Sequence, residues 1–155
     1  MAIPPEDIDD EEREIALLEA ERLIELGRIE WDESRYAEAI TCFKGALESF
    51  RDHHHSVGVT QALGHLGNAH HAQGQPEPAE QYFHEAIQIA RELETKNIEG
   101  THLGNLGLVY KTQGQYDRAI EHFQKALTIS REIGDKLAES VDLGSLGSVF
   151  AAHGH

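Results

Sequence analysis

The strongest constraint in this sequence is a segment that recurs every forty residues. Residues 60–99 and 100–139 align without a gap, with fifteen identical positions. A more divergent copy occupies residues 20–59, and residues 140–155 begin a fourth copy and stop halfway. Such a period is typical of stacked repeats, in which each unit buries its apolar face against its neighbours. We expect one array over residues 9–155, preceded by a flexible acidic N-terminus at residues 1–8.

Each repeat is predicted to contain two helices. A polar Gln-Gly-Gln turn at residues 73–75 and again at 113–115 places a glycine where a first helix must end. Gly134 ends a second helix in the same way, and Asp135 is suited to cap the next helix. Apolar spacing between these turns predicts helices near residues 9–32, 35–52, 56–73, 76–94, 96–113, 116–133 and 136–152.

Two glycines inside a predicted helix require a reason. Gly104 and Gly107 each cost about 1 kcal/mol relative to alanine in a helix interior. Gly107 shares a helix face with Leu103, Leu106 and Tyr110, and we expect it to let the paired helix approach closely. On that second helix a large phenylalanine between small alanines would interdigitate with this face.

These residues resemble the tetratricopeptide repeat. The family's pattern of Leu, Gly, Tyr, Ala, Phe and Ala is matched by Leu106, Gly107, Tyr110, Ala119, Phe123 and Ala126. The forty-residue period and the LGNLG segment at 103–107 are similar to the subclass found in Pins/LGN adaptors and many bacterial regulators. HEAT and armadillo arrays lack this spacing. The resemblance implies an all-α, right-handed superhelix of about three and a half helix-turn-helix repeats that binds other proteins.

The resemblance also implies a concave groove lined by the first helix of each repeat. Mapping the exposed face of these helices gives a predicted peptide-binding set: Glu25, Arg28, His65, Asn68, His71, Asn105, Leu108, Lys111, Ser145 and Ser148. Ile24 and Leu108 would supply apolar contact, and the amides of Asn68 and Asn105 could pair with a peptide backbone. Gly64, Gly104 and Gly144 would keep the groove floor low.

Other classes of function find no support in the sequence. A formal net charge of −15 opposes binding to nucleic acids and to anionic membranes. No motif for a catalytic residue or a cofactor is found, and the histidine run at 53–55 lacks the spacing of a metal site. The lone Cys42 and the absence of a signal-like N-terminus favour a cytoplasmic location.

The charge is concentrated at the start of the chain. Residues 1–25 hold ten acidic residues and only two basic ones, Arg13 and Arg22. Acidic side chains near a helix N-terminus are favourable, so this region is interpreted either as a solvated capping end or as an acidic patch for a basic partner.

The fourth copy raises a question about assembly. Leu143, Leu146, Val149 and Phe150 would form an apolar edge, with Val149 and Phe150 partly exposed, and such an edge marks an interaction surface or a truncation. The edge fits a fragment of a longer array, self-association into a homo-oligomer, or a tolerated half-covered helix. The leading function is therefore a non-catalytic module that binds a peptide or helix of a partner protein in its groove. The rival is a scaffold that oligomerises through this edge.

Overall fold

The computed structural model describes residues 9–154, which form seven α-helices and no strand. The predicted flexible N-terminus, residues 1–8, lies outside the described residues. Every predicted helix is present with its ends within two residues, so the all-α repeat fold is confirmed. The helices are α1 (Asp10–Asp32), α2 (Tyr36–Asp52), α3 (Ser56–Ala72), α4 (Pro76–Glu92), α5 (Lys96–Thr112), α6 (Tyr116–Ile133) and α7 (Lys136–His153).

All six turns between these helices use the same geometry. A residue with positive φ recurs every twenty positions, at Ser34, His54, Gly74, Glu94, Gly114 and Gly134. At each turn this residue donates its N–H three residues back, and the next residue donates five residues back. These are the two hydrogen bonds of a Schellman motif, and they satisfy the last free carbonyls of the helix. The sequence predicts a helix break at each of these turns and a glycine at three of them, but not the positive φ at Ser34, His54 and Glu94.

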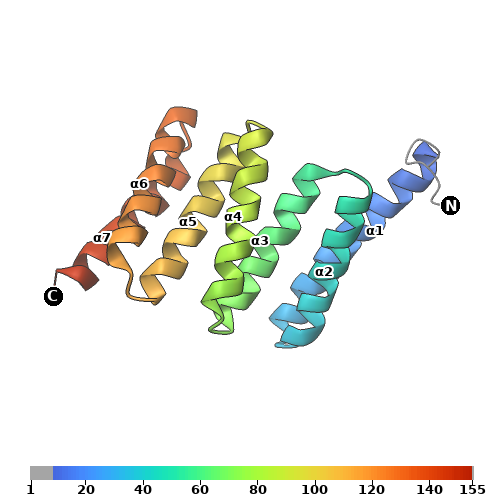
Figure 1. Cartoon of the computed structure of the whole chain (residues 1–155), viewed down its shortest axis with the longest axis horizontal. Coiled ribbons are helices and arrows are strands. Elements are labelled where there is room, and N and C mark those ends of the chain that lie inside the picture. Colours follow the sequence, from blue (N-terminus) through green and yellow to red (C-terminus); the bar gives the residue numbers. More distant parts are fainter. Residues whose placement is uncertain (1–8, 155) are drawn as a thin grey trace. The chain divides into compact units, whose positions relative to one another are not determined.

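The chain divides into two compact units, Met1–Ala62 (unit 1) and Leu63–His155 (unit 2). In unit 1, α1 and α2 run side by side as a pair (Figure 1). In unit 2, α4 packs on α5, α5 on α6 and α6 on α7 (Figure 1). The prediction that all repeats form one array stays a prediction. Among the described residues, no helix combines the length and the apolar character needed to cross a membrane.

Contact between a glycine and a phenylalanine joins the two helices of each repeat. A Cβ atom added at Gly67 would lie 2.6 Å from a ring atom of Phe83, and the same contact recurs between Gly27 and Phe43 and between Gly107 and Phe123. Each phenylalanine is buried. The helices therefore approach as closely as a hydrogen atom in place of a side chain allows, as the sequence predicts.

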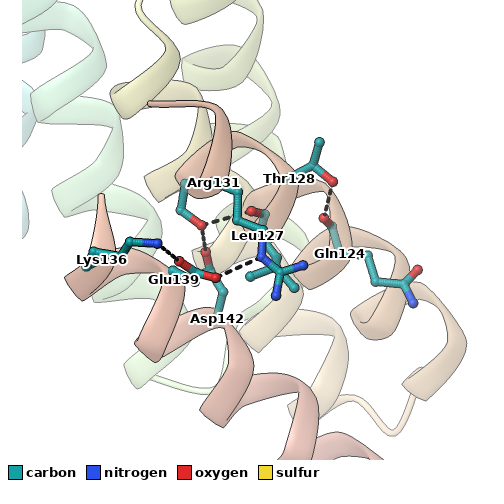
Figure 2. Close-up of polar contacts among 8 residues, drawn as sticks. Gln124, Leu127, Thr128, Arg131, Lys136, Glu139 and Asp142 are labelled. Carbon is teal, nitrogen blue, oxygen red and sulfur yellow. Dashed lines mark hydrogen bonds and ion pairs between the residues drawn. The ribbon is translucent and has the colours of Figure 1, made fainter. Parts of the chain in front are cut away.

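Polar contacts join a second helix to the first helix of the following repeat. Arg131 Nε of α6 donates to Glu139 Oε1 of α7 at 2.8 Å, and Lys136 Nζ lies 3.0 Å from Glu139 Oε2. Figure 2 shows both contacts as dashed lines. These two hydrogen bonds lower the pKa of Glu139. Arg91 Nε of α4 makes the same 2.8 Å bond to Glu99 Oε1 of α5. An arginine in the last turn of α4 and of α6 thus contacts the first helix of the next repeat.

We predict opposite effects for two alanine substitutions at equivalent glycines. Gly67→Ala should destabilise the fold by about 2 kcal/mol, because its methyl group would overlap the buried ring of Phe83. Gly147→Ala should stabilise it by about 1 kcal/mol, because among the described residues no atom other than the adjoining backbone of α7 lies within 4 Å of the new methyl group, and alanine favours helix. Urea unfolding followed by circular dichroism measures both effects. Equal effects at the two sites would show that ring contact is not what selects glycine.

Candidate functional site

A cleft of about 500 Å³ lies among α5, α6 and α7 in unit 2. The first helices of two successive repeats, α5 and α7, form its walls, and α6 contributes side chains between them. The α5 wall includes Asn97, Thr101, Gly104, Asn105 and Leu108, and the α7 wall includes Leu137, Ala138, Val141, Asp142 and Ser145. The cleft is thus built on helix faces that the three packed helices hold in place.

The rim of the cleft is unusually apolar for an exposed surface. Four large aliphatic side chains reach it and remain exposed: Leu108 at 42%, Ile133 at 44%, Leu137 at 78% and Val141 at 60%. Single exposed aliphatic residues are common, but a contiguous group around a hollow marks an interaction site.

Polar groups lie between these aliphatic side chains. The half-buried side chain of Asn105 lines the cleft and forms no hydrogen bond among the described residues, so its amide donor and acceptor are both available. Thr101 Oγ1 donates to the Asn97 carbonyl at 3.0 Å within α5. The cleft can therefore desolvate an apolar segment and also pair with one peptide group.

The structure brings some of the predicted groove residues together and leaves others apart. Asn105, Leu108 and Ser145 line the cleft. At its end, Lys111 Nζ of α5 donates to Ser148 Oγ of α7 at 2.9 Å. A second hydrogen bond, 2.9 Å long, joins His71 Nε2 of α3 to Thr112 Oγ1 of α5. Lys111 and Ser148, both predicted groove residues, thus contact each other across two neighbouring first helices, whereas His71 contacts a residue outside the predicted set.

The remaining predicted groove residues lie outside this cleft. Asn68 is exposed and His65 is half-buried, both on α3. Glu25 and Arg28 belong to unit 1, where they form an exposed ion pair at 3.0 Å. The two residues are one helical turn apart on α1, a spacing at which ion pairs form on any helix surface, so this pair is not evidence of a ligand site.

Two details of the groove prediction are wrong. Ile24 was expected to line the groove but is 1% exposed, because it points with Ala20 and Gly27 into the packed side of α1. Gly64 was expected to lower the groove floor, yet a Cβ atom there would lie 2.7 Å from the His102 ring. Gly64 therefore makes room for a side chain of α5 and not for a ligand.

The predicted apolar edge on α7 is narrower than the sequence suggests. Leu146 and Val149 are buried in the core of unit 2, so the expectation that Val149 is partly exposed is wrong. They share the face of α7 that carries Asp142 and packs on α5 and α6. Leu143 and Phe150 remain 46% and 54% exposed, beside Gly147.

Sequence reasoning missed several residues of the cleft. Ile133 and Leu137 are two of its four large exposed aliphatic side chains, and Asp142 stands in its wall. A signal was present for Leu137, since it lies four residues before Val141, which the repeat register places on the groove face of a predicted helix. Ile133 is the last residue of α6, and its place in the cleft depends on how α6 meets α7, which the repeat pattern does not fix.

Comparison with known proteins decides the family. A family model described as the tetratricopeptide repeat matches residues 18–92 and 98–155, which is most of the chain. The chain belongs to the tetratricopeptide repeat family. No curated protein sequence matches it significantly.

Solved structures share the fold of this tetratricopeptide repeat protein at low sequence identity. Aspartyl phosphate phosphatase F from Bacillus subtilis is 18% identical, with a TM-score of 0.85 over 95% of this chain and 37% of that one. The apo form of RapI is 18% identical, with a TM-score of 0.82 over 96% and 52%. BtubC from P. vanneervenii is 21% identical, with a TM-score of 0.79 over 87% and 56%. The chain thus spans between about a third and just over half of these structures, and the likeness shows the fold alone.

The histidines and the cysteine of the tetratricopeptide array have local roles. His55 Nδ1 accepts the Gly58 N–H at 3.0 Å, and His70 stacks on the Tyr82 ring at 5.4 Å. Within residues 9–154, no group of three or more His, Cys, Asp or Glu side chains could hold a metal ion. Burial, and secondarily the charge of Glu30, raises the pKa of the Cys42 thiol, which reduces its nucleophilicity at neutral pH.

Asp142 is an ionisable group in the wall of the cleft. Its Oδ2 lies 3.0 Å from Ser130 Oγ, and Ser130 Oγ also lies 3.0 Å from the Leu127 carbonyl that it can donate to. Burial raises the pKa of Asp142, the hydrogen bond from Ser130 opposes this, and the charge of Asp135 adds to it. Ser130 has a single proton for two acceptors, so an ionised Asp142 competes with the Leu127 carbonyl.

We predict that Asp142→Asn stabilises the fold at pH 7 by about 1 kcal/mol, the typical net contribution of one hydrogen bond. The amide can donate to Ser130 Oγ while Ser130 donates to Leu127. Because the pKa of Asp142 is raised in the folded state, protonated Asp142 stabilises the fold relative to the ionised form. In the wild type this stabilisation is lost as pH rises through the folded-state pKa. The gain should therefore shrink towards pH 4. Thermal unfolding at both pH values measures this, with Glu132→Gln on the exposed side of α6 as the control; an equal gain at both pH values would contradict the prediction.

Proposed function

We propose that this protein is a non-catalytic interaction module that binds a peptide or helical segment of a partner protein in the α5–α7 cleft. Membership of the tetratricopeptide repeat family supports the general role, since its arrays are protein-interaction scaffolds. The cleft supports the location, because it combines exposed aliphatic side chains with unused amide groups.

One observation carries the proposal: Leu108, Ile133, Leu137 and Val141 are exposed together around a single hollow. Exposing them to water is unfavourable, at about 25 cal/mol for each Å² of apolar surface. An apolar segment of a partner would remove that surface from water. The Asn105 amide would pair with the backbone of the segment and fix its register.

We predict that Leu137→Ser combined with Val141→Ser abolishes capture of the partner from a lysate of the encoding organism. Both side chains are exposed, so the fold should persist. The captured partner is then divided into synthetic peptides, and fluorescence anisotropy gives the Kd of the binding segment. Asn105→Ala should weaken that Kd about tenfold through loss of one hydrogen bond.

A matched control is Leu93→Ser, which removes an exposed leucine outside the cleft. It should leave capture and peptide affinity unchanged. If the cleft double variant captures the same partner as the wild type, binding occurs elsewhere and the proposed site is wrong.

A second candidate function is a scaffold that assembles through the edge of α7. The specific support is Gly147. The equivalent glycines at 27, 67 and 107 each contact a phenylalanine ring, whereas no side chain of the described residues lies within 4 Å of a Cβ added at Gly147. With Leu143 and Phe150 exposed beside it, α7 offers a face shaped for a helix that is not bound.

Under this second function, Phe150→Asp should convert an oligomer to a monomer, because a carboxylate cannot be desolvated cheaply in an apolar contact. Sedimentation velocity at several protein concentrations measures the change. The cleft variant Leu137→Ser should sediment like the wild type, since it leaves the edge intact. A wild type that is monomeric at every concentration excludes the scaffold.

The finer predictions rest on the sequence. Similarity to the Pins/LGN subclass depends only on the forty-residue period and the LGNLG segment at 103–107. A cytoplasmic location, the lack of a cofactor and the exclusion of nucleic acids as partners follow from residue usage and net charge, and each stays a prediction.

A further inference from the structure

Helix α1 in unit 1 carries a second apolar face that no described residue covers. Its packed side buries Ala20, Ile24 and Gly27 against α2. On the other side, Ile15, Leu18, Leu26 and Ile29 are 44–53% exposed. We call these four residues the α1 stripe. Their spacing of three, eight and three residues keeps them on one side of the helix over four turns.

The repeat register shows what kind of surface the α1 stripe is. Leu26 corresponds to Leu66, Leu106 and Leu146, all buried, and Ile29 corresponds to Ala69, Val109 and Val149, also all buried. In the later repeats this face packs against the second helix of the preceding repeat, as α5 does on α4 and α7 on α6. The stripe therefore has the chemistry of the fold's own helix-stacking face.

In the later repeats, a glutamate on the equivalent face of the first helix is paired with an arginine. Glu99 and Glu139 each accept a 2.8 Å hydrogen bond from an arginine in the last turn of the covering helix, Arg91 or Arg131. Glu19 occupies the equivalent position on α1. It is exposed and has no ion-pair partner among the described residues. Glu19 therefore marks the place where a covering helix would present an arginine.

The charges around the stripe define the partner further. Exposed Glu12 and Glu19 flank it on one side, and exposed Glu14, Glu21 and Glu25 flank it on the other. Arg22 lies within the stripe, where its aliphatic stem can extend the apolar surface. Two shallow hollows, lined by Leu18, Arg22, Leu26, Ile29 and neighbouring glutamates, run along this face. Acidic flanks on an apolar stripe favour a helix with basic flanks.

We propose that the α1 stripe binds an amphipathic helix of another protein, with an aliphatic face, arginine or lysine on both flanks, and one arginine paired with Glu19. The helix lies antiparallel to α1, as α4 lies on α5 and α6 on α7. A second copy of this chain does not fit this description. Two α1 stripes would bring acidic flanks against acidic flanks, and the exposed edge of α7 carries no arginine.

The probe is a synthetic 21-residue helix with leucine at the heptad a and d positions and arginine at e and g. A control peptide has the same leucines with glutamate at e and g. Fluorescence anisotropy of the labelled peptides, with the full chain as titrant, measures binding. We expect the arginine peptide to bind and the glutamate peptide to bind at least about tenfold more weakly, with the difference decreasing at high salt.

Substitutions then locate the binding surface. Leu18→Ser combined with Leu26→Ser should weaken the arginine peptide at least about tenfold, and Glu19→Gln about threefold or more. All three side chains are exposed, so the fold should persist, and circular dichroism checks this. Glu48→Gln, an exposed charge on α2, is the matched control and should change nothing.

The cleft variant Leu137→Ser/Val141→Ser separates this proposal from the function proposed above. It should bind the arginine peptide like the wild type, because its substitutions lie in unit 2. The proposal is overturned if the stripe double variant binds the peptide as tightly as the wild type, or if the glutamate peptide binds equally well. It is also overturned if the wild type self-associates in a manner that Leu26→Ser removes, since a second copy would then occupy the stripe.

Discussion

The contact between one glycine and one phenylalanine sets the geometry of every complete repeat. With no side chain at Gly27, Gly67 or Gly107, the phenylalanine sixteen residues later reaches the backbone of the facing helix. This approach fixes the rotation of both helices about their own axes. The rotation then decides which residues face the next helix and which face solvent, so the cleft and the exposed stripe both follow from it.

Sequence reasoning works well for features that repeat and poorly for features that do not. Glycine, phenylalanine and the turn glycines recur at fixed intervals, so the helices and their pairing could be predicted. Ile24 and Val149 were placed wrongly because a shift of one position rotates a residue by about a quarter turn, and the spacing alone does not fix the boundary of a buried face. The positive φ at three turns was not predicted, because serine, histidine and glutamate stand there in place of glycine.

The cleft was only half predictable for a related reason. Asn105, Leu108 and Ser145 came from the repeat register, and the structure places them on the cleft wall. Ile133 and Asp142 depend on how α6 and α7 meet, which is a tertiary feature. The two candidate surfaces also differ in chemistry: amides and aliphatic groups line the cleft, whereas carboxylates border the α1 stripe. They suit different ligands for that reason.

The regular spacing of residues with positive φ determines where the number of repeats can change. Because a residue with positive φ lies at every twentieth position from 34 to 134, any forty-residue cut from one turn to the equivalent turn removes one of the pairing glycines and one of the pairing phenylalanines. Gene duplication or deletion between equivalent turns keeps each remaining glycine sixteen residues before a phenylalanine. A loss of twenty residues would instead place two first helices, or two second helices, next to each other. Repeats can therefore be added or removed at these turns without any change to the residues that pack in the core.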